Sequence, residues 1–309
     1  MNTDRFHGRV AVITGAARGQ GRSHALRLAA EGADVIALDI CHDIDSVAYD
    51  LATRDDLAET ARLVRERGRR VATAEVDVRD ADALATAVSR AVDELGAEPD
   101  VVLANAGIGL MRPDDPQRAF RDQLDVNLTG VWNTVQAVAP RMIERGRGGS
   151  IVLTSSAFGL TGRGGDGAGG SDGYVAAKHG VVGLTRTFAN WLAPHGIRVN
   201  CVNPSGVATR MVLNPAVEAL FGGGSDPNPD PKPTEVTNSS WRTNVRGDWR
   251  TTTTTSRQDA AISGAPPAPG SRTAGASYDP PTMVVLMLAN RSSWAAPRKP
   301  TSIRPGCSQ

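Results

Sequence analysis

The chain has 309 residues, a formal net charge of +1 and 40% hydrophobic residues. This length suits one large α/β domain or two small ones, and the near-zero charge does not favour nucleic acid or an anionic membrane surface. The three cysteines lie far apart, at Cys41, Cys201 and Cys307, and form no CxxC pair. Free thiols in a reducing compartment are therefore expected, rather than a metal site or disulfides. No signal-like opening and no membrane-length apolar run is present, which predicts a soluble, cytoplasmic protein.

The first two thirds of the chain alternate short apolar runs with helical stretches. Helical stretches are predicted at residues 55–67, 80–95 and 124–145. The apolar runs are nearly continuous, as in strands buried on both faces of a parallel sheet, and lie at residues 10–13, 35–38, 101–103, 151–153 and 197–199. This alternation predicts an α/β fold, a single-domain Rossmann-type doubly wound parallel sheet.

The alternating pattern stops near Phe221, which is the one domain boundary that the composition supports. Residues 222–281 are rich in Pro, Gly, Thr, Ser and Asn, and their apolar residues are too sparse to bury a core. An apolar island near residues 283–290 resembles a remnant helix. The sequence therefore predicts a catalytic domain over residues 1–221 and an atypical, largely disordered tail over residues 222–309.

A glycine-rich turn follows the first apolar run and precedes a helical stretch. Residues 14–21 read TGAARGQG. Glycines let the backbone turn tightly and approach a pyrophosphate, and the helix N-terminus offers N–H groups and a partial positive charge. The alternative is an ordinary glycine-rich turn, but the strand before and the helix after favour a dinucleotide site. The candidate cofactor-binding residues of this turn are Gly15, Arg18, Gly19, Gln20 and Gly21.

Asp39 ends the second apolar run, about 20 residues after the glycines, where dinucleotide-binding folds place a ribose-binding acid. A carboxylate there accepts hydrogen bonds from the ribose hydroxyls and repels a 2′-phosphate, so NAD is favoured over NADP. Arg18 argues the other way because it could meet a 2′-phosphate, but Asp39 lies at the ribose itself and should prevail. The alternative for Asp39 is a solvated strand-end residue. His24 and His195 have no partners at metal-ligand spacing, so no metal is predicted.

Four motifs in chain order resemble those of the short-chain dehydrogenase/reductase family. Residues 14–21 match its TGxxxGxG turn, residues 105–107 its NAG motif, residues 174–178 its YxxxK motif, and residues 204–209 its PG segment near the nicotinamide. Asp77 follows the third strand and is expected by the adenine, although a plain strand-end aspartate is the alternative. The resemblance implies a site for NAD that also includes Asp77, Val78, Asn105, Ala106, Gly107, Tyr174, Lys178, Pro204, Gly206, Val207 and Thr209.

A narrower resemblance is to the mycofactocin-coupled, carveol-dehydrogenase-like subfamily. It rests on residues 15–24 (GAARGQGRSH), 38–41 (LDIC) and 174–183 (YVAAKHGVVG), and on a longer segment at residues 41–57. In that subfamily the longer segment covers the cofactor, so the resemblance implies tightly bound NAD that a separate redox carrier reoxidises in place. The apolar side chains expected to lie over the cofactor are Ile44, Val47, Tyr49 and Leu51.

Tyr174 and Lys178 lie four residues apart on a predicted helix, so their side chains leave from one face. Tyrosine, with a pKa of about 10, is a weak base at neutral pH, but an ammonium group and the positive nicotinamide ring both favour the phenolate. Tyr174 is predicted to exchange a proton with the substrate oxygen. By resemblance, Ser156 rather than Ser155 binds that oxygen, and Asn127 helps hold a water relay to the lysine, although Asn127 alone could be a helix cap.

The leading hypothesis is an NAD-dependent enzyme that transfers a hydride between a secondary alcohol or ketone and its cofactor. The alternatives are an NAD-binding protein that is catalytically impaired by its abnormal C-terminus, and a 3-oxoacyl-type ketoreductase. The glycine-rich stretch at residues 161–173 is longer than usual for the family and is expected to loosen substrate positioning. The family forms homo-oligomers, which we expect to be weakened here because residues 295–300 (AAPRKP) cannot form a central strand.

Overall fold

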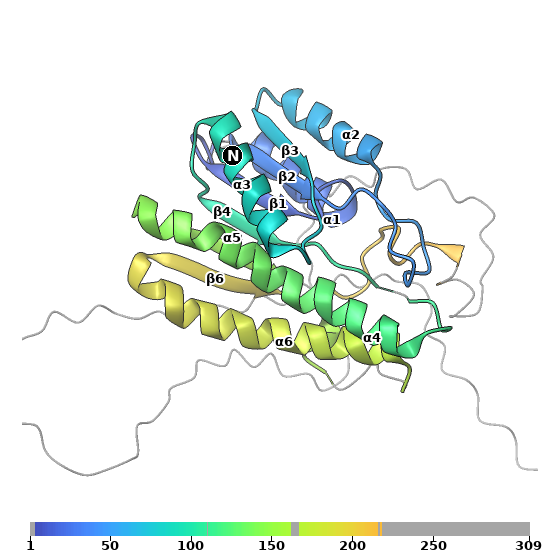
Figure 1. Cartoon of the computed structure of the whole chain (residues 1–309). Coiled ribbons are helices and arrows are strands. Elements are labelled where there is room, and N and C mark those ends of the chain that lie inside the picture. Colours follow the sequence, from blue (N-terminus) through green and yellow to red (C-terminus); the bar gives the residue numbers. More distant parts are fainter. Residues whose placement is uncertain (1–3, 110, 162–166, 216, 218–309) are drawn as a thin grey trace, which may run out of the picture.

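The computed structural model of the chain describes residues 4–109, 111–161, 167–215 and 217 (Figure 1). Six parallel strands form one sheet in the order β3-β2-β1-β4-β5-β6. The strands are β1 (Val10–Thr14), β2 (Asp34–Asp39), β3 (Val71–Glu75), β4 (Val101–Ala104), β5 (Gly149–Thr154) and β6 (Ile197–Val202). The order reverses between β1 and β4, which confirms the predicted doubly wound sheet and creates a crevice at the carboxyl ends of these strands.

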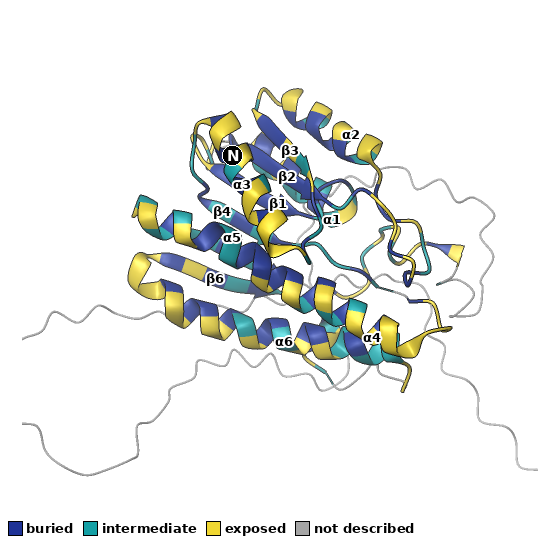
Figure 2. Cartoon of the chain, in the orientation of Figure 1, coloured by how far each residue is buried: buried dark blue, intermediate teal, exposed yellow. Residues whose placement is uncertain are grey.

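Helices cover both faces of the sheet, and the central strands are buried on both sides (Figure 2). On one face, α1 (Gly19–Ala30) and α2 (Arg54–Arg65) pack on side chains such as Ile13 and Val35. On the other face, α3 (Ala81–Leu95), α5 (Gly130–Arg145) and α6 (Gly169–Leu192) pack on side chains such as Val12 and Ile36. Successive strand residues point to opposite faces, so both layers share the same strands.

The predicted helix at residues 124–145 belongs to a longer composite helix. It begins as α4 (Pro116–Leu124), passes through a π-helical turn (Asp125–Thr129) and continues as α5. In the π turn the Gly130 N–H bonds to the carbonyl of Asp125, five residues back. Gly130 is required there because a Cβ atom would lie 2.5 Å from Cγ2 of Val78. The helical stretch expected at residues 124–145 is therefore present, but a π turn interrupts its regular geometry.

The glycine-rich stretch at residues 161–173 is only partly a loop. Its last five residues are the first turns of α6. A Cβ atom on Gly169 would lie 1.8 Å from the carbonyl oxygen of Pro116, and one on Gly173 would lie 2.8 Å from that of Phe120. These glycines let α6 approach α4 closely, which corrects the expectation that the whole stretch is a loop. Residues 162–166 lie outside the described part of the chain.

The predictions for residues 222–309, including the boundary at Phe221, the disordered tail and the remnant helix, fall outside the described residues. Within the described ranges, no helix is both long enough and apolar enough to span a membrane. The same ranges contain no group of three or more His, Cys, Asp or Glu side chains that could hold a metal ion.

Candidate active site

A cavity of about 500 Å³ lies at the carboxyl ends of β1 to β4, where the strand order reverses. Tyr49 lines it, as expected of the segment after β2, and so do residues that the sequence did not predict, among them Arg210 and Met211. The structure brings together in this cavity most of the predicted cofactor-binding residues, namely Gly15, Arg18, Gly19, Gln20, Asp39, Asp77, Val78, Asn105, Ala106, Gly107 and Thr209.

The glycine turn is built around close backbone contacts. A Cβ atom on Gly21 would lie 1.9 Å from the carbonyl oxygen of Gly15, and one on Gly15 would lie 2.8 Å from Cα of Ala106. Gly19 has a positive φ of 56°, a conformation that side chains disfavour. The Asn105 amide donates to the carbonyls of Thr14 and Gly15 at 3.1 and 3.3 Å. Asn105 therefore holds the turn in shape, and Gly21 serves packing rather than the cavity wall.

Asp39 lies at the end of β2 with only 8% of its surface exposed, so the alternative of a solvated strand-end residue is wrong. One carboxylate oxygen accepts the Ala17 N–H at 2.8 Å. Burial raises the pKa of Asp39, and the hydrogen bond from the Ala17 N–H opposes this shift. The carboxylate thus faces the cavity and fastens the glycine turn at the same time.

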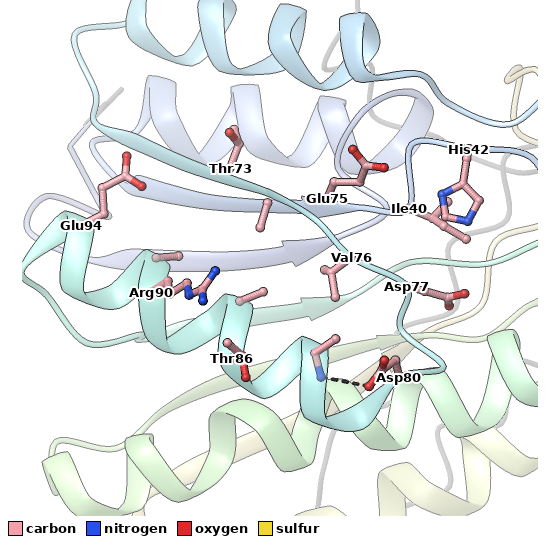
Figure 3. Close-up of a pocket in the computed structure, with 14 residues that line it drawn as sticks. Ile40, His42, Thr73, Glu75, Val76, Asp77, Asp80, Thr86, Arg90 and Glu94 are labelled. Carbon is pink, nitrogen blue, oxygen red and sulfur yellow. Dashed lines mark hydrogen bonds between the residues drawn. The ribbon is translucent and has the colours of Figure 1, made fainter.

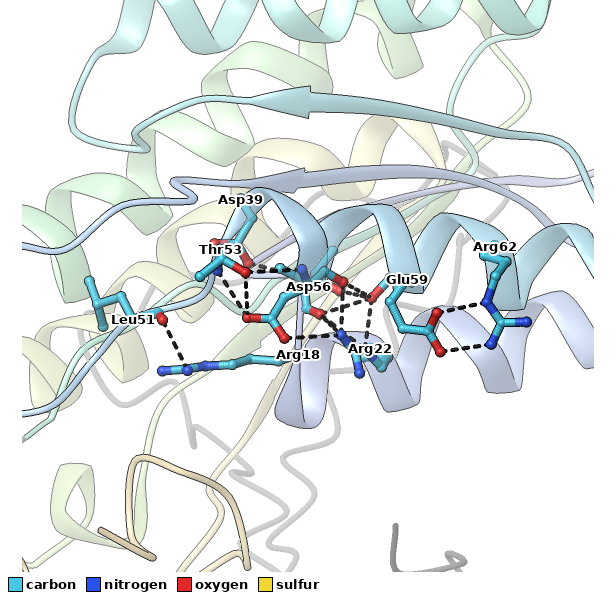
Figure 4. A network of polar contacts seen from close by, with 11 residues as sticks. Arg18, Arg22, Asp39, Leu51, Thr53, Asp56, Glu59 and Arg62 are labelled. Atoms are coloured by element: carbon cyan, nitrogen blue, oxygen red, sulfur yellow. Dashed lines mark hydrogen bonds and ion pairs between the residues drawn. The ribbon is translucent and has the colours of Figure 1, made fainter. Parts of the chain in front are cut away.

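The guanidinium of Arg18 is bound to the segment that follows β2 (Figure 4). It donates to the carbonyls of Asp50 and Leu51 at 2.5 and 3.0 Å. Burial lowers the pKa of Arg18, and the charge of Arg210 lowers it further. Arg210 also lines the cavity, so two cations lie near this wall. Arg18 is thus committed to backbone carbonyls, which weakens the argument that it would receive a 2′-phosphate.

Residues 41–53, here called the covering segment, cross one side of the cavity; residues 54–57 of the expected stretch belong to α2. Tyr49 and Leu51 line the cavity, whereas Val47 pairs with Met111 beyond it. Apolar side chains of the segment pack in one cluster with Val78, Ile108, Met111, Ala119 and Val126. The segment is therefore attached at two places, to Arg18 beside the glycine turn and to the chain that follows β4.

Tyr174, Lys178 and Ser156 meet beside the cavity, although none of them lines it. The Lys178 Nζ donates to the carbonyl of Thr154 at 3.0 Å and lies 5.6 Å from the centroid of the Tyr174 ring. The Ser156 side chain lies close to the Tyr174 hydroxyl, and its Oγ accepts the Phe158 N–H at 3.2 Å. Ser155 instead donates to the carbonyl of Lys178 at 2.7 Å, so it fixes the α6 backbone. This difference agrees with the choice of Ser156 as the residue that faces a substrate oxygen.

Burial governs the protonation of this cluster. It raises the pKa of Tyr174, and the nearby Ser156 side chain opposes that rise. The ammonium of Lys178 is buried, which lowers its pKa to about 8. The protein alone therefore does not produce the lowered tyrosine pKa expected from a neighbouring lysine. A further positive charge in the cavity is needed to favour the phenolate.

Asn127 is fully buried in the π turn, so the helix-cap alternative is wrong. Its amide oxygen accepts the Ile108 N–H at 3.2 Å, and its amide nitrogen donates to the Ile108 carbonyl at 3.0 Å. A Cβ atom on Gly107 would lie 2.7 Å from the Asn127 Oδ1 and 3.5 Å from the Lys178 Nζ. Gly107 therefore borders both the cavity and the Tyr174 cluster, and connects the two.

The remaining predicted residues lie at the margins. The Asp77 carboxylate accepts from the Arg79 Nε at 2.8 Å while lining the cavity, so it is more than a plain strand-end aspartate. The Pro204 carbonyl accepts the Ala157 N–H at 2.8 Å, which joins the end of β6 to the Ser156 turn. Gly206 and Val207 follow Pro204 but are not part of the cavity wall. The missed residues Arg210 and Met211 directly follow Thr209, so the end of the PG segment was the available signal.

A second cavity, of about 760 Å³, runs along β3 and α3 (Figure 3). It adjoins the first at Ile40, Val76 and Asp77, and its far end is lined by Arg90 and Glu94. Apart from Asp77, it contains none of the predicted site residues. The smaller cavity is therefore the candidate active site, because the glycine turn, the acid at β2 and the tyrosine cluster meet around it.

Known proteins resemble this chain over the same residues. A sequence model described as short chain dehydrogenase matches residues 9–216. An uncharacterized oxidoreductase of Mycobacterium tuberculosis is 56% identical over 209 residues, 68% of this chain and 75% of that protein. The (-)-trans-carveol dehydrogenase of Rhodococcus erythropolis is 48% identical, with 70% of this chain and 77% of that protein covered. The crystal structure of carveol dehydrogenase from Mycobacterium avium in complex with NAD has 51% identity and a TM-score of 0.66, covering 71% and 78% of the two chains.

Proposed function

Because the chain belongs to the short-chain dehydrogenase family, we propose that it is an NAD-dependent oxidoreductase that interconverts a secondary alcohol and a ketone. The observation that carries this proposal is the position of Gly107, which borders both the cavity at the glycine turn and the cluster of Tyr174 and Lys178. A cofactor in the cavity and a substrate at the tyrosine would then lie side by side, as hydride transfer requires.

The residues around the cavity fit NAD. The turn leaves no room for side chains at Gly15 and Gly21, and a helix N-terminus follows it, which suits a pyrophosphate. Asp39 presents a buried carboxylate for the ribose hydroxyls. When bound, NAD supplies the hydride acceptor at its nicotinamide ring. The short-chain dehydrogenase motifs and the residues that line the cavity therefore both support NAD as the cofactor.

Each residue of the cluster has one task in the proposed reaction. Tyr174 takes the proton of the substrate hydroxyl, and in the reverse direction returns it to the ketone oxygen. Ser156, whose side chain lies close to the Tyr174 hydroxyl, donates to the same substrate oxygen and steadies its developing charge. Lys178 supplies a buried ammonium beside the tyrosine ring. Asn127 fixes the Ile108 peptide next to this lysine.

Asp39 should determine the choice between NAD and NADP. We expect the parent protein to bind NAD more tightly than NADP, because the carboxylate repels a 2′-phosphate, and Asp39→Ala to narrow that difference by about tenfold or more. Calorimetric titration of the cofactor-free protein with both dinucleotides measures it. Arg65→Gln, an exposed arginine on α2, serves as control. Equal affinity of the parent for the two cofactors would contradict the assignment.

We further propose that NAD is retained between turnovers and reoxidised in place by a separate redox carrier, the mycofactocin-type arrangement. The covering segment supports this proposal, because it is attached both to Arg18 and to the chain after β4. NAD should then co-purify, and turnover with free NAD should be slow unless an artificial electron acceptor is added. Rapid steady turnover with free NAD alone would argue against retention.

Arg18 provides a direct test of retention. Arg18→Gln loses two charge-assisted hydrogen bonds to the covering segment, so release of bound NAD should accelerate about tenfold or more. Displacement of bound NAD by an excess of ADP-ribose gives the release rate. Arg65→Gln should release NAD as slowly as the parent, because this arginine lies on the exposed side of α2. An unchanged rate in Arg18→Gln would mean that the segment does not retain the cofactor.

The substrate we propose is a cyclic secondary alcohol of the carveol type, on the strength of the carveol dehydrogenase relative. Addition of carveol to the purified protein should produce the near-ultraviolet absorbance of reduced nicotinamide. Bound NAD without such a change would favour the impaired, NAD-binding alternative. A preference for NADPH and for carrier-linked ketones would favour the 3-oxoacyl-type ketoreductase.

A homo-oligomer is also proposed. Three large aromatic side chains leave 36–43% of their surface exposed, although such side chains favour burial: Phe120 on α4, Trp132 on α5 and Trp191 on α6. These helices lie on one side of the sheet in Figure 1. Light scattering of the purified chain gives its assembly state and shows whether it is smaller than the tetramer expected of the family.

A further inference from the structure

The dipeptide Ile108-Gly109, called the peptide below, lies outside the helices and strands of the described structure, yet the N–H and carbonyl groups of both residues are all bonded. Asn127 binds both the N–H and the carbonyl of Ile108. The Gly109 carbonyl accepts from the Gln123 amide, and the Gly109 N–H donates to the Tyr49 hydroxyl at 3.0 Å. Since unpaired buried backbone groups are costly, these three side chains fix the peptide. Gln123 also bonds to Asn127, so two of the three are themselves connected.

This peptide directly follows Gly107, which borders both the cofactor cavity and the catalytic cluster, and is called the wall below. Ile108 lines the cavity and is 3% exposed. The preceding residue, Gly107, has no room for a side chain because Asn127 and Lys178 lie against it. A shift of the peptide would therefore change the spacing between a dinucleotide in the cavity and Lys178. Small displacements of this kind slow reactions that depend on the alignment of two reactants.

Tyr49 is the member of the set that comes from a different part of the fold. Asn127 and Gln123 belong to the composite helix, whereas Tyr49 belongs to the covering segment. It lines the cavity, and a Cβ atom on Gly109 would lie 3.6 Å from its hydroxyl oxygen and 2.9 Å from Cγ of Met211. Burial raises the pKa of Tyr49 to about 12, with Tyr174 close enough to add to the rise, so its hydroxyl stays protonated. Tyr49 thus connects the covering segment with the Ile108-Gly109 wall.

We propose that Tyr49 is a positioning residue for hydride transfer: through its hydrogen bond to Gly109 it aligns the covering segment with the wall beside the catalytic cluster. The inference rests on the proposed NAD-dependent function and deepens it. The Tyr49 hydroxyl then helps both to enclose the cofactor and to align it with the catalytic cluster. A tyrosine that only packs on the cofactor would affect retention, but not the rate at which an enclosed cofactor is reduced.

Tyr49→Phe keeps the ring and removes only the hydroxyl, so the test separates alignment from packing. The protein is purified with its bound NAD, mixed with carveol, and followed through a single turnover without added acceptor. We expect hydride transfer to slow about tenfold, the order expected when a buried N–H loses its partner. Release of NAD should also become faster. In amide hydrogen exchange, the peptide that contains Gly109 should lose protection.

Asp45→Asn is the matched control on the same segment. It breaks an ion pair with Arg118 that is exposed on both sides, and exposed pairs contribute little. This variant should match the parent in single turnover, in NAD release and in amide exchange at Gly109. If Asp45→Asn slowed hydride transfer as much as Tyr49→Phe, general disturbance of the segment would explain the effect and the proposal would fail.

Two other outcomes decide between the proposal and its premise. Parental hydride transfer in Tyr49→Phe, with only NAD release changed, would reduce Tyr49 to a packing role and overturn the inference. If the parent itself bound no NAD or did not respond to the alcohol, the proposed function would fail. Amide exchange still reports on Tyr49 in that case: unchanged protection at Gly109 in Tyr49→Phe would show that the hydroxyl does not hold the wall.

Discussion

Tyr174→Phe should lower the turnover of alcohol by ~10²–10⁴-fold, the range for loss of a positioned acid or base, while NAD remains bound. The substitution removes the hydroxyl that exchanges the substrate proton and keeps the ring. The edge-to-face contact with Phe158, with centroids 6.4 Å apart, therefore remains. The rate of nicotinamide reduction by carveol measures the first effect, and the NAD content of the purified variant measures the second.

Ser155→Ala and Ser156→Ala provide the comparison for this result. Ser156 lies close to the Tyr174 hydroxyl, whereas Ser155 donates to the Lys178 carbonyl. Ser156→Ala should therefore impair turnover more than Ser155→Ala, which should act mainly on thermal stability. Parental activity in Tyr174→Phe would mean that another group transfers the proton, and the assignment of the tyrosine would have to be abandoned.

Lys178→Met should lower turnover by ~10²-fold or more, as when one preorganised donor is removed from an active site, and should also weaken NAD binding. The lysine is buried between the Thr154 carbonyl and the Tyr174 ring, so both the tyrosine and a cofactor beside Gly107 lose a positive neighbour. Methionine has similar length without the charge. Turnover and calorimetric NAD affinity are the two measurements, and loss of turnover with parental affinity would limit Lys178 to the chemical step.

The same variant has a distinct dependence on pH. Burial lowers the pKa of Lys178 to about 8, below its ordinary value of 10.5, so the folded cofactor-free protein disfavours the charged lysine. Between these two values the unfolded chain binds more protons, and stability therefore rises with pH across this window. Below it the full penalty applies, on the order of 3 kcal/mol. The free energy of unfolding, measured in urea near neutral and alkaline pH, should rise with pH more in the parent than in Lys178→Met. The same pH dependence in both proteins would contradict this prediction.

Much of the fold followed from local signals in the sequence. The five apolar runs that became strands are short and nearly continuous, so the parallel sheet was predictable. The strand β3 was not among them, because exposed residues alternate with half-buried ones in its second half. The glycine turn was also predictable, because its steric demands at Gly15 and Gly21 act over a few residues. The acid at Asp39 followed from its distance along the chain to that turn.

The features that the sequence did not predict depend on contacts between distant residues. The π turn lies beside the close contact between Gly130 and Val78, and no pattern within residues 116–145 reports that contact. The commitment of Arg18 to Asp50 and Leu51 depends on how the covering segment folds back. The bond between Tyr49 and Gly109 joins residues 60 positions apart. Tyr49 was expected only as apolar cover, and its polar role became evident from the structure.

The hydrogen bond from the Ala17 N–H to Asp39 limits how this chain could change its dinucleotide during evolution. A mutation that removes the carboxylate to admit NADP also removes an acceptor that shapes the glycine turn, so the first step toward the new cofactor loses affinity for both. Asparagine is the exception, because its amide oxygen can still accept the Ala17 N–H without the negative charge. A change of cofactor from NAD to NADP should therefore begin with Asp39→Asn, before a basic residue appears nearby. Direct replacement by alanine should not lead to the new cofactor, because it loses the acceptor for the Ala17 N–H.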